Sequence, residues 1–307
     1  MQPSEPQARV VVGVDGSPSS LAAVACAARE AELRKAALRV VHAFSWPTAH
    51  TALDRAVSRP LRAHLLEAAD RLLEEAMVRA REAVPGVEAR GAVMRGEPLT
   101  VLEAESRAAE LVVVGSRGLG GFAGLLVGST STRLASHARC PVLVVREPAD
   151  PAGPILLGVD GSPAGAEAVR FAFDEAGRRR AGLVALHAWT TWNTPLPRPV
   201  SPALPCANEP SAPAGAEERL LAEAVAGMRE RYPEVRVEQR ALHGPTRESL
   251  IEASRTAQLT VVGSRGRGGF AGLMLGSVSQ ALLHHAHGPV AVVRGRDEED
   301  MLQFGRP

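Results

Sequence analysis

The chain has 307 residues, of which 45% are hydrophobic and only 3% aromatic, and its 35 Lys and Arg nearly balance its 34 Asp and Glu. The length, about twice that of a typical domain, predicts two domains, and the net charge of +1 argues against nucleic acid or an anionic membrane as a partner. The three cysteines are scattered and have no CxxC spacing, which argues against disulfides and a zinc site. The first residues (MQPSEPQARV) do not resemble a signal peptide, and no apolar run is long enough to cross a bilayer. These features favour a cytoplasmic protein.

Strand and helix patterns alternate along the first half of the chain. Valine-rich runs predict buried strands, amphipathic runs predict helices, and Ser17 or Ser19 could cap the first helix. Five strands separated by helices predict a parallel sheet that is covered on both faces. The expected elements are a strand over 8–15, a helix over 18–36, a strand over 38–44, a helix over 61–84, a strand over 87–93, a helix over 98–110, a strand over 111–115, a helix ending near His137 and a strand over 141–145.

The second half repeats the first. GVDGSP at 13–18 returns at 158–163, and GSRGLGGFAGLLVGS at 115–129 shares 12 of 15 positions with GSRGRGGFAGLMLGS at 263–277. The repeat predicts two copies of one α/β domain, joined by a proline-rich linker. We expect the domains over 1–148 and 154–296, the linker over 149–153 and a C-terminal tail over 297–307, with the proline-rich stretch 190–215 as an irregular surface excursion.

Each half ends two of its strands with residues suited to a ligand. In an open parallel sheet, ligands bind beyond the carboxyl ends of the strands where the strand order reverses. If the first and fourth strands are neighbours, Asp15 and Gly115 face one crevice, as do Asp160 and Gly263. Glycines let backbone N–H groups approach an anion, and the serine that ends each segment begins a helix whose N-terminus favours negative charge, which indicates a phosphate-bearing ligand. Two alternatives stay open: a flexible glycine turn packed against the other half, and Asp15 as a cap for the following helix through its DGSP turn.

These motifs resemble those of the universal stress protein family. The pattern G-x-x-G-x9-G-[ST], which is that family's ATP-binding pattern, is complete in both halves, and the resemblance covers essentially the whole chain. It implies two flavodoxin-like or Rossmann-like domains of the adenine nucleotide α-hydrolase-like type, each with a five-stranded parallel sheet of order 3-2-1-4-5 and helices on both faces. It also implies one ATP per domain, on which Mg²⁺ could be held mostly through water.

The resemblance also implies roles for individual residues. Asp15 and Asp160 would hydrogen-bond the ribose hydroxyls, Gly13 and Gly158 would let the backbone pass near the nucleotide, and Ala43 and Ala188 would meet the adenine edge through main-chain groups. Arg117 and Arg265 could fork onto phosphate oxygens, or could be solvated loop arginines. The residues expected around the first triphosphate are Gly115, Ser116, Arg117, Gly118, Leu119, Gly120, Gly121, Gly128, Ser129 and Thr130. Those expected around the second are Gly263, Ser264, Arg265, Gly266, Arg267, Gly268, Gly269, Gly276, Ser277, Val278 and Ser279.

The glycine segments contain no acidic residue between Gly115 and Thr130 or between Gly263 and Ser279. Because hydrolysis needs a general base or a group that orients water, this predicts ATP binding with little turnover. The expected function is therefore a nucleotide-dependent sensor or regulator of stress response or growth, working through a regulatory protein partner. The alternatives are a slow ATPase or nucleotide-dependent transferase, and an interaction scaffold with vestigial crevices. The apolar final strands, PVLVV and PVAVV, predict that the two halves pair through them, and chains could then form a homodimer.

Several other residues carry weaker signals. His284, His285 and His287 stand close together, but the first half keeps only His137 at the matching place, so we expect no metal site. His42 and His187 recur at the ends of matching strands, where packing near the crevice is favoured over catalysis. Cys26 and Cys140 are expected to be small buried apolar residues.

Overall fold

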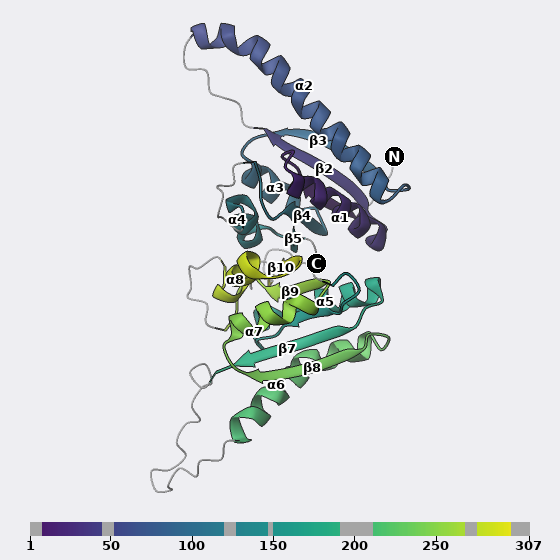
Figure 1. Ribbon diagram of the computed structural model, residues 1–307, viewed down its shortest axis with the longest axis vertical. Coiled ribbons are helices and arrows are strands. Elements are labelled where there is room, and N and C mark those ends of the chain that lie inside the picture. Colours follow the sequence, from purple (N-terminus) through teal and green to yellow (C-terminus); the bar gives the residue numbers. More distant parts are fainter. Residues whose placement is uncertain are drawn as a thin grey trace, which may run out of the picture. The chain divides into compact units, whose positions relative to one another are not determined.

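The computed structural model describes residues 8–44, 52–119, 127–146, 150–190, 211–267 and 275–295, and in the helices that begin at 52 and 211 it describes side chains from residues 64 and 214 onward. The chain divides into two compact units. Unit 1 comprises Met1–Glu147 with Pro289–Arg294, and unit 2 comprises Pro148–Gly288 with Gly295–Pro307. Figure 1 labels the elements of both units.

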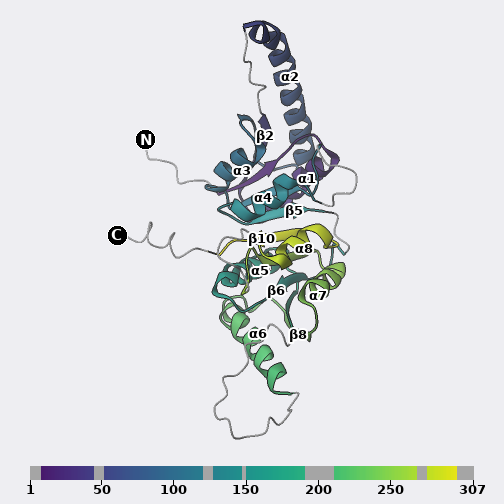
Figure 2. The ribbon, with the colours of Figure 1, turned by 90° about the vertical axis from the view of Figure 1, so that its left-hand side faces the viewer.

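Unit 1 is a parallel sheet between two pairs of helices. Its parallel strands lie in the order β3-β2-β1-β4-β5. Helices α1 and α2 pack together on one face, and α3 and α4 on the other (Figures 1 and 2). The elements are β1 (Arg9–Gly13), α1 (Pro18–Arg34), β2 (Ala37–Phe44), α2 (Ala52–Ala83), β3 (Ala89–Arg95), α3 (Pro98–Ser106), β4 (Leu111–Gly115), α4 (Ser129–His137) and β5 (Val142–Val145).

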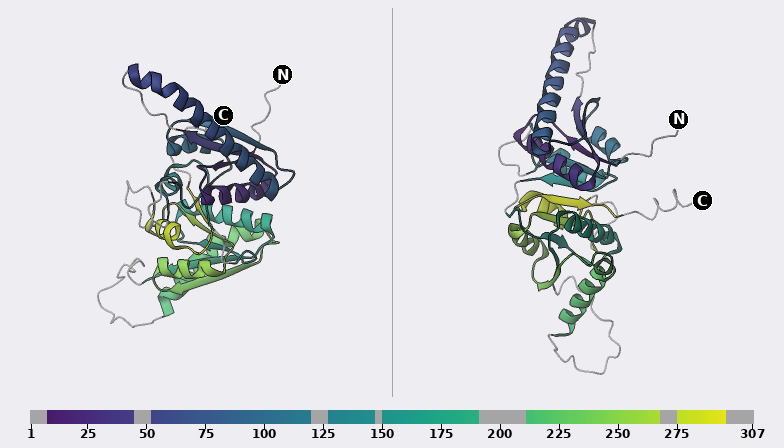
Figure 3. Two further views of the ribbon diagram at one scale, coloured as in Figure 1. Left: turned by 45° about the horizontal axis from the view of Figure 1, so that its top comes forward. Right: turned by 90° about the vertical axis from the view of Figure 1, so that its right-hand side faces the viewer.

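Unit 2 repeats this arrangement. Its parallel strands lie in the order β9-β6-β7-β8, with α5 packed against α6 and α7 packed against α8. The two further views in Figure 3 show these layers, and they show α2 of unit 1 extending past the strands that it covers. The elements are β6 (Ile155–Gly158), η1 (Pro163–Gly165), α5 (Ala166–Arg179), β7 (Leu183–Trp189), α6 (Ser211–Arg231), β8 (Val237–His243), α7 (Thr246–Ala253), η2 (Ser254–Thr256), β9 (Leu259–Gly263) and α8 (Ser277–His285).

The last strand of the chain, β10 (Val290–Val293), belongs to unit 1. It pairs antiparallel with β5, with Ala291 opposite Leu143. The two strands predicted to pair as apolar edges therefore do pair, because each would otherwise leave a row of backbone N–H and C=O groups without partners. As a result the strand count differs from the expected five per unit: among the described residues, unit 1 holds six strands and unit 2 holds four.

The elements follow from local sequence as expected, with differences at their ends. β4 is an LVVVG run in which every residue is buried, as a central parallel strand requires. Ser17 caps α1, because its side chain accepts the Ser20 N–H. α2 begins at Ala52 rather than at 61, and α6 begins at Ser211, inside the stretch expected to be irregular, whose residues 191–210 lie outside the described residues. Among the described helices, none is both long enough and apolar enough to cross a membrane.

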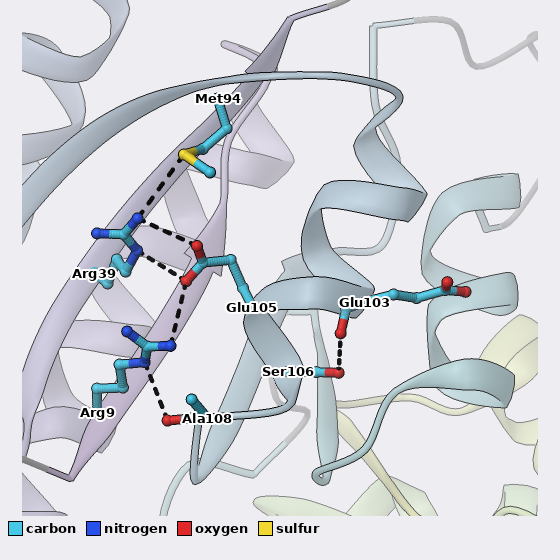
Figure 4. Close-up of polar contacts among 7 residues, drawn as sticks. All are labelled: Arg9, Arg39, Met94, Glu103, Glu105, Ser106 and Ala108. Atoms are coloured by element: carbon cyan, nitrogen blue, oxygen red, sulfur yellow. Dashed lines mark hydrogen bonds and ion pairs between the residues drawn. The ribbon is translucent and has the colours of Figure 1, made fainter. Parts of the chain in front are cut away.

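A cluster of charges fixes α3 against the sheet of unit 1 (Figure 4). Glu105 of α3 accepts hydrogen bonds from Arg39 of β2 at 2.8 Å and 3.2 Å, and its Oε2 lies 3.7 Å from Arg9 Nη2. Arg9 also donates to the Ala108 carbonyl at 3.0 Å, and Arg39 contacts the Met94 sulfur at 3.9 Å. One carboxylate thus connects a helix to two neighbouring strands.

Candidate functional site

The candidate site of unit 1 lies where β1 and β4 end. These two strands are parallel neighbours, with Val12 in register with Val113, so the residues that follow them leave the same edge of the sheet. Asp15 follows β1 by two residues, and the glycine segment begins at Gly115, the last residue of β4. The structure therefore brings together the aspartate and the glycine segment that the sequence placed in one crevice.

The Asp15 carboxylate connects its own turn to the glycine segment. Its Oδ1 accepts the Ser17 N–H at 3.0 Å, and its Oδ2 accepts the Leu119 N–H at 2.9 Å. Burial acts to raise the pKa of Asp15, but the hydrogen bonds from Ser17, Leu119 and Ser20 outweigh it and hold the pKa below the ordinary value of 3.8. The carboxylate therefore stays ionised near neutral pH while it accepts N–H groups from both sides of the crevice.

Two glycines of the segment are required by close contacts. A Cβ at Gly118 would lie 2.5 Å from Asp15 Oδ2, and a Cβ at Gly115 would lie 2.6 Å from Ser19 Oγ and 2.8 Å from the Ser19 carbonyl oxygen. A side chain at Gly115 would displace the backbone at Ser19, and one at Gly118 would displace the Asp15 carboxylate. The spacing between these two glycines thus lets the segment pass directly over the aspartate and the start of α1.

Serines connect the segment to both neighbouring helices. Ser17 donates to the Arg117 carbonyl at 3.3 Å, and Ser131 in the first turn of α4 donates to the Gly115 carbonyl at 2.8 Å. The Gly128 N–H donates to the Ser116 carbonyl at 2.8 Å, which brings the start of α4 back to the end of β4. Gly128 is the N-cap of α4 and gives it no side-chain cap, so the N–H groups of the first turn are available to an anion.

Unit 2 contains the same arrangement. Asp160 Oδ1 accepts the Ser162 N–H at 3.0 Å and the Ser162 hydroxyl at 2.8 Å, and Oδ2 accepts the Arg267 N–H at 2.9 Å. A Cβ at Gly266 would lie 2.7 Å from Asp160 Oδ2. Ser279 donates to the Gly263 carbonyl at 2.7 Å, and Gly276 is an N-cap without a side-chain bond. The bonds from the aspartate to its own turn and to the glycine segment, and the bond from the serine of the following helix, therefore recur in both units as a common framework.

The two units differ at the side chains around this framework. Arg267 stands in unit 2 where unit 1 has the exposed Leu119, and its guanidinium lies against the Gly161 turn. A hollow of about 560 Å³ opens there, between that turn, α6 and the glycine segment, and it is lined by Gly161, Ala216, Arg219, Leu220, Glu223, Ala224 and Arg267. The second crevice thus has a guanidinium beside the turn that follows its aspartate, where the first has an apolar side chain.

The histidines at the ends of β2 and β7 hold the same place in the two units. His42 Nδ1 lies 2.8 Å from the Val14 carbonyl oxygen, and His187 Nδ1 lies 2.7 Å from the Val159 carbonyl oxygen. Both carbonyls immediately precede the site aspartates. The next residues, Ala43 and Ala188, lie on the same strands, and Thr246 donates to the Ala188 carbonyl at 3.0 Å.

The remaining predicted positions fall into two groups. Gly13 and Gly158 end β1 and β6, and Ser129, Thr130, Ser277 and Val278 lie in the first turns of α4 and α8. Gly120, Gly121, Gly268 and Gly269 lie outside the described residues. At the end of α8, the rings of His284 and His285 are 6.0 Å apart, and in the described part of the chain no three His, Cys, Asp or Glu side chains gather as metal ligands would.

Sequence reasoning missed three contributors to the site. Ser131 was not proposed, although aligning GSTS (128–131) with GSVS (276–279) would have matched it to Ser279. Ser19, considered only as a helix cap, instead accepts the Arg117 N–H at 3.3 Å. Glu217, 2.9 Å from His187 Nε2, carried no signal, because the matching residue of the first half is Ala69.

Comparison with known proteins agrees with this geometry. The sequence pattern of the universal stress protein family matches residues 8–146 and 152–294. "Universal stress protein Rv1996" and "Universal stress protein Rv2623" of Mycobacterium tuberculosis are each 40% identical to the chain over 302 and 299 residues, which is 93% of this chain and 94% and 96% of theirs. The crystal structure of a universal stress protein from Archaeoglobus fulgidus shares the fold, with a TM-score of 0.69 at 17% identity over 93% of this chain and 98% of that one. The chain therefore belongs to the universal stress protein family.

Proposed function

We propose that the chain is an ATP-binding universal stress protein with one nucleotide site in each half, over residues 1–148 and 154–296. It acts in the cytoplasm as a sensor or regulator whose nucleotide state alters contacts with a protein partner during stress or changes in growth, and two chains form a homodimer. Mg²⁺ accompanies the nucleotide on its phosphate oxygens, mostly through water.

The observation that carries the proposal is the repeated bond between an aspartate and the glycine segment. The N–H groups of Leu119 and Arg267 each donate to a carboxylate oxygen at 2.9 Å, so the segment already binds an anionic oxygen in both halves. A phosphate oxygen offers the same kind of acceptor, and the uncapped first turns of α4 and α8 add further N–H donors. The aspartates, which would repel a phosphate, suit the hydroxyls of a ribose.

Little turnover follows from what surrounds the proposed phosphates. Efficient hydrolysis needs a general base or a group that orients water, together with a metal and a charge clamp. Asp15 and Asp160 are the carboxylates that bond to the glycine segments, and both are engaged by backbone N–H groups. A carboxylate with a lowered pKa, as at Asp15, is also a weak base.

The nucleotide content of the purified protein tests the proposal most directly. Denaturing the chain should release adenine nucleotide, and calorimetry with ATP should detect two sites. Asp15→Ala and Asp160→Ala should each weaken one site at least about tenfold, because each removes hydrogen bonds to a ligand from an ionised group. Asp70→Ala, at an exposed position of α2, is the matched control and should leave both sites intact.

Three outcomes would contradict parts of the proposal. Neither released nucleotide nor ATP affinity in either half would favour a scaffold with vestigial crevices. Multiple turnovers at an enzyme-like rate, abolished by either aspartate variant, would favour an ATPase or a transferase. A monomeric mass in solution would rule out the homodimer.

A further inference from the structure

The second crevice contains a buried ionisable pair, and among the described residues the first crevice has no counterpart to it. His187 of β7 and Glu217 of α6 are 5% and 6% exposed, and His187 Nε2 lies 2.9 Å from Glu217 Oε2. In the first half, His42 is matched to His187, but the place of Glu217 is taken by the buried Ala69. The pair is therefore a property of unit 2 rather than of the repeated framework.

The geometry fixes where the protons lie. A carbonyl oxygen can only accept, so the Val159 carbonyl at 2.7 Å requires a proton on His187 Nδ1. If Nδ1 carries the proton and the ring is neutral, Nε2 has a lone pair and can only accept a hydrogen bond. An ionised Glu217 oxygen can also only accept, so two acceptors would face each other at 2.9 Å. A proton must therefore lie between His187 Nε2 and Glu217, which makes the pair either imidazolium with carboxylate or imidazole with carboxylic acid.

The His187 ring bonds to the backbone of the residue that precedes the site aspartate. The Val159 N–H donates to the Leu186 carbonyl at 2.9 Å, and its carbonyl accepts from His187, so both polar groups of Val159 are fixed by β7. The next residue is Asp160, which meets the Arg267 N–H of the glycine segment. Glu217 bonds the other nitrogen of the ring, so His187 is held at both edges, whereas His42 makes the matching carbonyl contact with Ala69 in place of the carboxylate. Glu217 therefore adds a second restraint on the ring that holds the Val159 carbonyl, and through it on the path of the chain into Asp160.

We propose that His187 and Glu217 form a positioning pair for the second nucleotide site, holding Asp160 in the orientation that binds the ribose of an adenine nucleotide. The inference rests on the proposed function, because it assigns a role in that same site. Removing Glu217 takes away the bond at Nε2, so that the ring is restrained by its Nδ1 bond to the Val159 carbonyl and no longer at both nitrogens. We expect this to weaken ATP binding in the second crevice about tenfold, as the loss of a residue that orients a ligating group commonly does.

The test uses the full chain carrying Asp15→Ala, so that ATP titrated by calorimetry reports on the second crevice alone. Glu217→Ala should weaken binding about tenfold. Glu217→Gln should keep the ATP affinity within about twofold of that of the Asp15→Ala chain. The amide N–H of glutamine can donate to His187 Nε2, while Nδ1 keeps its proton and donates it to the Val159 carbonyl. Glu218→Gln, at an exposed position beside the pair, is the matched control and should have no effect.

Nitrogen NMR of the His187 ring supplies a readout that does not depend on ligand or on a variant's folding. In the unsubstituted chain, Nδ1 should carry a proton and Nε2 should lie in a hydrogen bond to Glu217, and a ring with an unprotonated Nδ1 would overturn the inference. Unchanged ATP affinity in folded Glu217→Ala would overturn it as well, while leaving the proposed function intact. Lack of ATP binding in both the Asp15→Ala and the Asp160→Ala backgrounds would instead refute the proposed function, and this inference with it.

Discussion

Replacing Glu105 by alanine tests how much the charge cluster of Figure 4 stabilises unit 1. Removing one partner of a fully buried ion pair costs ~3–5 kcal/mol, because the other charge is left in a poorly solvated place. Glu105 is 10% exposed, but the side chains of Arg9 and Arg39 retain 32% and 29% exposure, so water can solvate them once the carboxylate is gone. We therefore expect Glu105→Ala to lower the free energy of unfolding by about 1–2 kcal/mol.

The second half shows how the same place is filled without charge. Val184 and Ala253 stand where the first half has Arg39 and Glu105. The double variant Arg39→Val with Glu105→Ala should therefore be less destabilised than Glu105→Ala alone, because one of the two uncompensated guanidinium groups is also removed.

Scanning calorimetry of the full chain measures both effects. For a unit of about 150 residues, a loss of 1–2 kcal/mol lowers the midpoint of its transition by about 2–8 °C. Glu110→Ala, an exposed carboxylate near the end of α3, is the control and should shift it by less than about 1 °C. An unchanged midpoint in Glu105→Ala, or a double variant that is less stable than the single one, would refute the reasoning.

Two further predictions concern titratable groups. Because the pKa of Asp15 lies below its ordinary 3.8, the ionised carboxylate stabilises the fold above that pH, and this contribution disappears as the pH falls through the folded pKa. The thermal midpoints of the natural chain and Asp15→Asn should therefore differ most above pH 4 and converge at lower pH, and a difference that grows as the pH falls would contradict this. Burial raises the pKa of Cys140 to about 12 from an ordinary 9.0, so its thiolate fraction at pH 8 should be about a thousandfold smaller than in the unfolded chain. Iodoacetamide should accordingly label Cys140 far more slowly in the folded chain, and equal labelling rates before and after denaturation would show the burial to be unimportant.

Sequence reasoning predicted the features that depend on backbone pattern. The valine runs became buried strands, and the family resemblance supplied the order 3-2-1-4-5 that unit 1 shows across its parallel strands. The meeting of Asp15 with the glycine segment followed from the ends of neighbouring strands. The assignment of β10 to unit 1 did not follow, because which strands share a compact unit depends on long-range pairing that local pattern leaves open.

Individual contacts were harder to predict than elements. Asp15 accepts the Ser17 N–H in the turn before α1, and it also reaches the glycine segment that was expected to share its crevice, while its bonds to a ribose stay a prediction. Its partner in the segment is the N–H of Leu119. Every residue except proline has a backbone N–H, so the residue type does not indicate which one donates. The pairing of Glu217 with His187 joins a helix to a strand 30 residues away, and the registration of a long helix on a sheet is set by packing.

The duplication separates what the fold requires from what each site can vary. A Cβ at Gly118 or Gly266 would lie 2.5 Å and 2.7 Å from the aspartate carboxylate, so a side chain in either copy would displace that carboxylate and disturb its bond to the segment. Leu119 and Arg267 contribute only their N–H groups to that bond, so their side chains are free to differ. Selection can therefore alter the charge and the positioning groups of one crevice while the framework of both is kept. Two sites built in this way should share a ligand class and differ in affinity, which measurement of each crevice separately would reveal.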